Sequence, residues 1–395
     1  MIFNTFAYYC FFLIPAALSF RICSERSRPW ILVAFGFVFF VYFSYLYLGG
    51  VYAAACVGLF AWEATLQQAY RSRSKVCLLG IAASLGILGV FKYWNFATDL
   101  ITVGMDKNTL RWDGAFLPLG VSFFTFEFIH YAADRYRNKA EKGTFAEYLA
   151  FIFFFPTMVA GPIKRFQDFV PCLRNPSVDW QLDFNRGITR ILTGLVKKFA
   201  VADLLTSLTD HLNYADIALA ERWVLPIWLF AYGWKIYFDF SAYSDIAIGS
   251  GRLFGIAIPE NFDWPYFRTS ITEFWRHWHI SLYKWLVDYV FIPLGGSRVS
   301  GGKVYRNILL VMLVSGVWHG AGVNYVVWGL WHGIMLCIHR WMTAARENLD
   351  PPASASPYRR FGGWLATYVG VNLGWAFFAM DMETATFFFK RLVLG

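Results

Sequence analysis

The stretch NILLVMLVSGVWHGAGVNYVVWGLWHGIMLCI, from Asn307 to Ile338, contains 32 residues and no charged side chain. Arg306 and Arg340 bound it on its two sides. A single helix of this length exceeds the roughly 20 residues that cross the apolar part of a bilayer. Glycines and an asparagine within Trp318–Tyr325 favour a turn near its middle. The pattern predicts a re-entrant hairpin of two half-length helices, with His319 at its tip.

The composition of the whole chain agrees with this interpretation. The sequence has 395 residues, of which 57% are hydrophobic and 15% are charged. A soluble domain has about 45–50% apolar and about 25% charged residues. These values predict an all-α polytopic membrane protein, a helical bundle with about eight full spans and further re-entrant or half helices. We expect one transmembrane domain over residues 1–395, with N-terminal helices at 1–113, a core at 114–338 and a C-terminal loop and final span at 339–395.

The basic loops indicate the orientation of the helices. The net charge is +9, and lysine and arginine concentrate in Arg21–Pro29, Arg71–Lys75 and Asp134–Lys142. Loops with little or no net charge, at Gly49-Gly50 and Asp106–Thr109, alternate with them. Because cytoplasmic loops are rich in lysine and arginine, this alternation predicts an outside N-terminus and does not indicate a nucleic-acid partner.

Other apolar runs are interpreted as further membrane segments. Phe145–Gly161 is short and has basic residues on both sides, which favours a re-entrant segment or one that lies on the membrane. Longer runs near Ile188–Leu205, Trp223–Ile258 and Phe361–Met380 are interpreted as spans. The N-terminal run has no basic residues before it, which favours a first membrane helix over a cleaved signal.

No metal site or disulfide is predicted. The six cysteines show no spacing typical of a disulfide framework or a metal site. His277 and His279 form an HxH pair, but no carboxylate or thiolate stands at ligand spacing.

His279 and His319 are the strongest candidates for chemistry. A histidine at membrane depth is costly unless it is paired, so it is a candidate for a functional site. Imidazole is suited to general-base work near neutral pH, and one of the two would deprotonate a hydroxyl while the other orients or polarises a carbonyl. No Ser–His–Asp signature or GxSxG motif is present.

The other histidines favour structural roles. His130 and His211 are interpreted as hydrogen-bonded core residues, and His339, beside Arg340, as interfacial. His332 repeats the WHG of His319 on the returning arm of the hairpin and is expected to pack near the site.

Two acids lie inside an apolar run. Asp239 and Asp245, within Tyr237–Gly249, could form a proton path or hold the second ring nitrogen of a histidine. They could equally be hydrogen-bonded anchors between helices, and the sequence leaves both readings open.

Seven stretches of the chain resemble one family, the membrane-bound O-acyltransferases. Within that family they resemble the bacterial branch of alginate O-acetylation and D-alanyl transfer. The stretches follow the family's order and are Gly120–Arg137, Met158–Phe166, Gly194–Asp203, Ile236–Gly249, Ile258–Arg298, Ser315–Gly333 and Gly374–Met380.

The resemblance implies a helical bundle around a central funnel, in which a cytoplasmic and an extracytoplasmic opening meet at the active site. It implies that His319, in the WHG motif, is the catalytic histidine and that His279, in the WRxWHxS motif, is the second one. The residues expected to support them are Asp239, Asp245, Trp278, Trp318, Asn324 and His332.

The resemblance also implies the substrates. The donor would be acetyl-CoA or a thioester on a carrier-protein phosphopantetheine arm, with no tightly bound cofactor. Basic residues that could attract donor phosphates, or could be ordinary cytoplasmic charge, are Lys164, Arg165, Arg276 and Lys284.

The implied protein is a multi-pass acyltransferase of the bacterial inner membrane, in contact with lipid. Its expected partners are a secreted or membrane-anchored SGNH-type acyltransferase or esterase and the machinery that makes a polysaccharide. The alternatives are D-alanyl transfer, acylation of a lipid or protein, and a non-catalytic role in export. The sequence leaves the acyl group, the polymer and the oligomeric state open.

Overall fold

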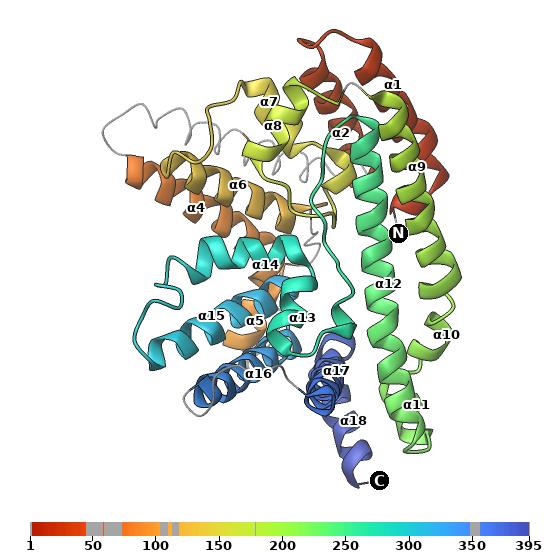
Figure 1. Ribbon diagram of the computed structural model, residues 1–395, viewed down its shortest axis with the longest axis vertical. Helices are drawn as coiled ribbons and strands as arrows, with labels where there is room; N and C mark the ends of the chain where they lie inside the picture. Colours follow the sequence, from red (N-terminus) through yellow and green to blue (C-terminus); the bar gives the residue numbers. More distant parts are fainter. Residues whose placement is uncertain are drawn as a thin grey trace. The chain divides into compact units, whose positions relative to one another are not determined.

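All regular secondary structure that the computed structural model describes is helical (Figure 1). The described residues are 2–44, 58, 73–102, 110–112, 118–177, 179–347 and 356–394. The backbones of Phe262 and Trp278 form an isolated antiparallel bridge between two segments of this part of the chain. The predicted all-α class is confirmed for these residues.

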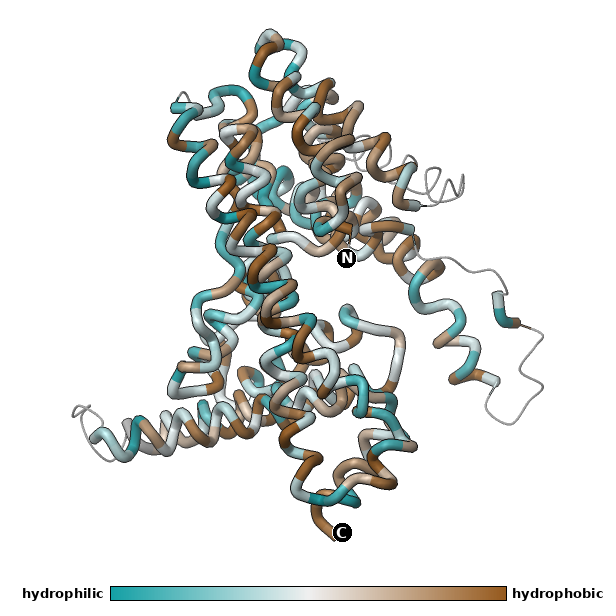
Figure 2. The backbone as a smooth tube through the Cα atoms, turned by 90° about the vertical axis from the view of Figure 1, so that its right-hand side faces the viewer, coloured by the Kyte–Doolittle hydropathy of each residue, from teal (hydrophilic) through white to brown (hydrophobic). Residues whose placement is uncertain are grey.

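The chain forms two compact units, which we describe separately. Unit 1 comprises Met1–Leu195 and Tyr243–Pro259, and unit 2 comprises Val196–Ala242 and Glu260–Gly395. The single domain over 1–395, with divisions after residues 113 and 338, stays a prediction. Hydrophobic residues run along the helices of both units, and many of the turns are hydrophilic (Figure 2).

Unit 1 contains the N-terminal helices around a core that is rich in phenylalanine and tyrosine. Its helices are α1 (Ile14–Ile22), α2 (Arg28–Phe43), α4 (Arg73–Leu88), α5 (Trp94–Ile101), α6 (Val121–Tyr136), α7 (Phe145–Ile152), α8 (Phe166–Arg174) and α9 (Trp180–Val196). The long helix α12 (Val224–Leu253) contributes residues to both units.

Unit 2 contains the histidine motifs. Its other helices are α10 (Thr206–Thr209), α11 (Tyr214–Leu219), α13 (Ile271–His277), α14 (Ile280–Leu286), α15 (Gly302–His319), α16 (Val323–Glu347), α17 (Pro357–Ala379) and α18 (Met382–Leu394). The expected run Phe361–Met380 corresponds to α17. The helix α18 was not predicted, because its sequence carries the charges of Glu383, Lys390 and Arg391.

One helical segment of the described chain, Ser74–Ile101, is by itself long and apolar enough to cross a membrane, with a mean hydropathy of 1.9 over its best window. Shorter apolar helices are Tyr8–Ile22, Arg28–Phe43 and Phe145–Thr157. The number of spans therefore stays a prediction. The loops expected at Gly49-Gly50 and Asp106–Thr109 lie outside the described residues.

The short apolar segment after residue 144 forms a short helix and a turn, and its re-entrant course stays a prediction. Helix α7 starts at a capping box in which Thr144 and Glu147 exchange hydrogen bonds. It has 8 residues, about 12 Å, and a 3-10 turn at Phe155–Thr157 follows it. Phe151 and Phe154 are fully buried inside unit 1, so the segment is enclosed by protein and does not lie along a surface. Irregular backbone at membrane depth is tolerated where protein covers it.

The predicted hairpin is present, but its helices are not half-length. Helix α15 ends at His319 and α16 begins at Val323, which confirms the break. The two helices have 18 and 25 residues, about 27 Å and about 37 Å. The prediction of half-length helices was wrong because the polar residues on both sides of the apolar run, from Gly302 and up to Glu347, are also helical.

Two glycines allow α15 and α16 to pack closely. A Cβ atom on Gly316 would collide with the carbonyl oxygen of Tyr325, and one on Gly329 would collide with the carbonyl oxygen of Met312. Small residues at such crossings let two backbones approach each other.

We expect Gly316→Ala to destabilise the hairpin, because the added methyl group would meet backbone and not a flexible side chain. Overpacking of this kind costs roughly 1–3 kcal/mol. The control is Gly86→Ala in α4, where a Cβ atom meets open space. The measurement is the apparent Tm of each variant in detergent, and equal values for both would contradict the close packing.

Candidate active site

His319 is held at the tip of the hairpin by aromatic rings. It is the last residue of α15, and the chain leaves the helix through extended backbone at Gly320. Its ring centroid lies 5.1 Å from that of Trp328 on α16 and 5.2 Å from that of Phe378 on α17, both nearly perpendicular to it. Residues of three helices of unit 2 therefore set the position of this imidazole.

His279 lies in the break between α13 and α14. Its backbone has φ 46° and ψ 54°, a left-handed conformation that is uncommon for a residue with a Cβ atom. The side chain is buried and packs edge-to-face on Phe240 of α12, with 4.7 Å between the centroids. Neither ring nitrogen has a hydrogen-bond partner among the described atoms.

The structure brings the two histidines together. Their ring centroids lie 6.5 Å apart, although the two residues belong to different motifs. Trp318 is next to both, with centroids at 6.3 Å from His279 and 4.9 Å from His319. Two imidazoles in one apolar neighbourhood can act on the same reacting group.

Tryptophans and a third histidine surround this pair. His332 is fully buried, and its ring lies 5.0 Å from Trp275 and 5.1 Å from Trp328. Because Trp328 also contacts His319, one tryptophan ring connects His332 to the pair, and a supporting role for His332 stays a prediction. Trp278 packs 5.0 Å from Trp375 of α17.

Asn324 supports the site through the backbone. Its amide nitrogen donates hydrogen bonds to the carbonyl groups of Phe377 (3.1 Å) and Met380 (3.2 Å). These carbonyls belong to the end of α17, where the last turn of a helix lacks partners of its own. Asn324 thereby ties the start of α16 to the segment that carries Phe378.

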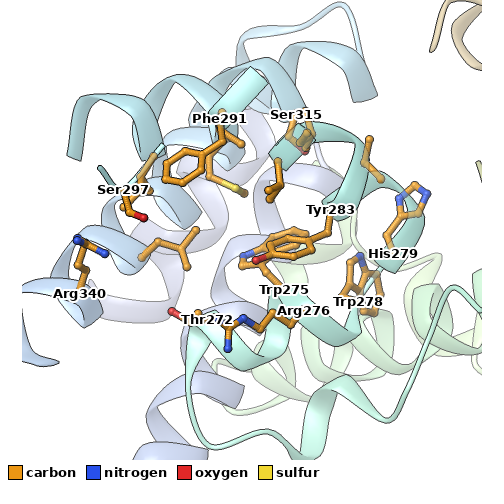
Figure 3. Close-up of a pocket in the computed structure, with 17 residues that line it drawn as sticks. Thr272, Trp275, Arg276, Trp278, His279, Tyr283, Phe291, Ser297, Ser315 and Arg340 are labelled. Atoms are coloured by element: carbon orange, nitrogen blue, oxygen red, sulfur yellow. The ribbon is translucent and has the colours of Figure 1, made fainter. Parts of the chain in front are cut away.

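A cavity of about 270 Å³ opens beside His279 (Figure 3). In Figure 3, His279 and Arg340 lie at opposite sides of it, with Trp275 and Tyr283 between them. Arg276 also lines it. The apolar part of its wall is formed by Leu282, Leu286, Val287, Phe291, Ile308, Val311, Met312 and Leu336. The cavity can accept a long, largely apolar group with a charged end.

The two acids of α12 form ion pairs with neighbouring helical segments. Asp239 accepts a hydrogen bond from the ammonium of Lys198 at 2.7 Å. In unit 1, Asp245 accepts one from Nε of Arg190 at 2.6 Å. These pairs favour the anchor reading over the proton path for both acids.

The four basic residues expected to bind the donor lie in different surroundings. Lys164 is buried, pairs with Glu127 and lies 4.5 Å from the ring centroid of Phe151. Arg165 precedes α8 in unit 1, and Lys284 is exposed on α14. Arg276 is the member of this set that lines the cavity.

The cavity also uses a residue that sequence reasoning did not assign to it. In the sequence, Arg340 was noted only as a charged residue after the apolar run. In the structure, Arg340 of α16 lines the cavity. The spacing of Arg340 four residues after Leu336 on one helix was the available signal.

The remaining histidines have separate surroundings. His130 is buried and its Nε2 accepts a hydrogen bond from the backbone of Phe166, as a core residue should. His211 is not in a core, because about half of its side chain is exposed beside Asp216. The prediction was wrong there because the helix-connecting loop turns outward. His339 bonds to Thr272.

The family described as membrane-bound O-acyltransferase matches residues 116–369, which contain both central histidines. The chain belongs to the membrane-bound O-acyltransferase family. It is therefore an acyltransferase and a membrane protein.

Relatives of this acyltransferase have related activities. A probable alginate O-acetylase from Pseudomonas aeruginosa is 38% identical over 390 residues, which cover 94% of this chain and 71% of that protein. A peptidoglycan O-acetyltransferase from Helicobacter pylori is 33% identical over 353 residues, with 80% and 64% covered. A teichoic acid D-alanyltransferase from Streptococcus thermophilus is 32% identical over 234 residues, with 56% of each chain covered.

For Lys164 of the acyltransferase we expect a structural effect. Lys164→Met leaves the carboxylate of Glu127 buried without its partner, and breaking a buried pair in this way costs about 3–5 kcal/mol. The double variant Glu127→Gln, Lys164→Met removes both charges and should recover most of the stability. Thermal unfolding in detergent measures both. Full stability of Lys164→Met together with a raised KM for the donor would instead favour phosphate binding by Lys164.

Proposed function

We propose that this acyltransferase moves an acetyl group from a cytosolic thioester to an extracytoplasmic polysaccharide, by way of a partner protein. The relatives named for O-acetylation align with more of this chain than the D-alanyltransferase, at 94% and 80% against 56%. This difference favours acetyl over D-alanyl transfer. The acetyl-accepting partner would be a secreted or membrane-anchored SGNH-type protein.

The observation that carries the proposal is the 6.5 Å separation of the His279 and His319 rings beside an apolar cavity. In the reaction, the oxygen of an acceptor hydroxyl attacks the thioester carbonyl carbon while His319 accepts the hydroxyl proton. The carbon–sulfur bond then breaks, and the protonated His319 returns the proton to the leaving thiolate. General-base catalysis of this kind contributes roughly 10²–10⁴ in rate.

His279 acts on the carbonyl in this scheme. An N–H of its imidazole donates a hydrogen bond to the carbonyl oxygen, which gains negative charge as the hydroxyl adds. The hydrogen-bonding capacity of this ring is unused within the described structure, so it remains available to substrate. Fixed positions for both substrates supply the rest of the acceleration.

The cavity beside His279 is the proposed donor site. The phosphopantetheine arm of coenzyme A or of a carrier protein is long and mostly uncharged, which suits the apolar wall. Arg276 and Arg340 stand on the wall with exposed side chains, and guanidinium groups bind phosphate through paired hydrogen bonds.

The proposed setting is the bacterial cytoplasmic membrane. Basic loops would face the cytosol, about eight helices would span the bilayer, and the donor would enter without crossing. The membrane-spanning domain would be continuous over residues 1–395, and its activity would depend on the polysaccharide machinery.

We expect His319→Ala to lower acetyl transfer about 10²–10⁴-fold, because the acceptor hydroxyl loses its base. The measurement is transfer of label from [¹⁴C]acetyl-CoA to polymer in membrane vesicles of the producing bacterium. The matched control is His211→Ala, which removes an exposed histidine from a loop. Normal turnover by a correctly inserted His319→Ala protein would exclude the base assignment.

We expect Arg276→Ala and Arg340→Ala each to raise KM for acetyl-CoA about three- to tenfold with little change in kcat, since an exposed charged hydrogen bond contributes modestly. The effect should shrink at high salt. Lys303→Ala is the control, because Lys303 is exposed at the start of α15 and does not line the cavity. An unchanged KM in both arginine variants would place the donor elsewhere.

A further inference from the structure

No hydrogen bond to a ring nitrogen fixes the orientation of the His279 ring among the described residues. A functional imidazole usually has its second nitrogen held by a carboxylate or a carbonyl group. Both nitrogens of His279 lack such a partner among the described atoms, and the ring contacts are those of aromatic neighbours. The direction of the side chain is therefore set by the backbone that carries it.

The backbone of His279 is left-handed, and Asn261 forms hydrogen bonds with the two residues that follow it. The carbonyl oxygen of Asn261 accepts a hydrogen bond from the backbone N–H of Ile280 at 2.9 Å. Its side-chain Oδ1 accepts two more, from the backbone N–H of Ser281 at 3.2 Å and from the hydroxyl of Ser281 at 2.9 Å. Asn261 is fully buried, so water cannot replace these bonds.

The two residues after Asn261, Phe262 and Asp263, fix the backbone that precedes His279. Phe262 and Trp278 form an antiparallel bridge, and the backbone N–H of Asp263 donates to the carbonyl of His277 at 3.1 Å. The residues immediately before and after His279 are thus fixed to one three-residue segment, while His279 itself turns away.

We propose that Asn261 is a positioning residue, which keeps His279 in its left-handed conformation and so aims the imidazole at the reacting carbonyl. The inference rests on the proposed role of His279. Without the Asn261 oxygen, Ser281 loses the two hydrogen bonds that its N–H and hydroxyl donate to it, and the turn can relax to an ordinary conformation. The ring then moves, and a misplacement of about 1 Å can lower a rate about hundredfold.

Substitutions of Asn261 can test the role of its side-chain oxygen. The amide oxygen is the acceptor of both side-chain bonds, so aspartate at this position keeps an acceptor of the same shape. Alanine removes it. Ser281→Ala removes one of the two side-chain bonds and leaves the other in place, so it is the milder variant.

The experiment is a double-mutant cycle with acetyl-CoA as the donor, in vesicles that contain the full chain. We expect Asn261→Ala to lower kcat about 10- to 100-fold, with KM for acetyl-CoA within about twofold of the parent. Asn261→Asp should retain more of the rate than Asn261→Ala, because it keeps the acceptor oxygen at the cost of a buried carboxyl group. In the His279→Ala background, Asn261→Ala should cause no further loss, because residues that act through one group are not additive.

The outcomes distinguish the positioning role of Asn261 from the proposed function of His279. A slow His279→Ala enzyme together with a normal Asn261→Ala enzyme overturns the positioning role and leaves the function of His279 intact. An equal loss from Asn261→Ala in both backgrounds shows a general structural role and also overturns it. A normal His279→Ala enzyme overturns both. Should Asn261→Ala fail to insert, Ser281→Ala replaces it, with a smaller expected loss and the same test of additivity.

Discussion

The left-handed backbone of His279 is the constraint on which the geometry of the candidate site depends. It ends the helical course between α13 and α14, with Trp278 extended and His279 in the left-handed region. This change of backbone conformation turns the side chains of Trp278 and His279 in different directions. Trp278 can therefore pack on Phe262 and Trp375, while the next ring in the chain reaches Phe240 and His319. A continuous helix would not separate these two neighbours in this way.

Aromatic packing takes the place of hydrogen bonds around His279 and His332. Buried polar groups normally find partners, and each exception needs a reason. His279 and His332 both have ring nitrogens without a described partner, and both are enclosed by rings of phenylalanine or tryptophan. For His279, which lines a cavity, the reason would be a substrate that supplies the missing partner. For His332, which is fully enclosed, packing against Trp275 and Trp328 is the visible role.

Charged side chains serve two different purposes in the structure. Inside the helices they are paired, as Asp239 is with Lys198 and Asp245 with Arg190, and such pairs hold neighbouring helical segments together. At the cavity, Arg276 and Arg340 are exposed, and Arg276 pairs with Glu273 of the same helix at 2.7 Å. An exposed arginine can exchange water or a surface partner for phosphate at low cost, because surface ion pairs are weak. A carboxylate as buried as that of Asp245 would be left without its counter-charge if its pair opened.

The sequence by itself determined the helical class, the membrane character, the break after His319 and the choice of the two histidines whose rings the structure brings together. These features follow from composition, from glycine near the middle of an apolar run and from motifs that are local in the chain. Only the tertiary structure decided the full length of α15 and α16, the burial of Lys164 and the place of Arg340 on the cavity wall. It also decided that Asn261 holds the turn of His279. The physical reason is that partners such as Asn261 and Ser281, or Lys164 and Glu127, are far apart in the chain, and no local pattern specifies which buried group a side chain will meet.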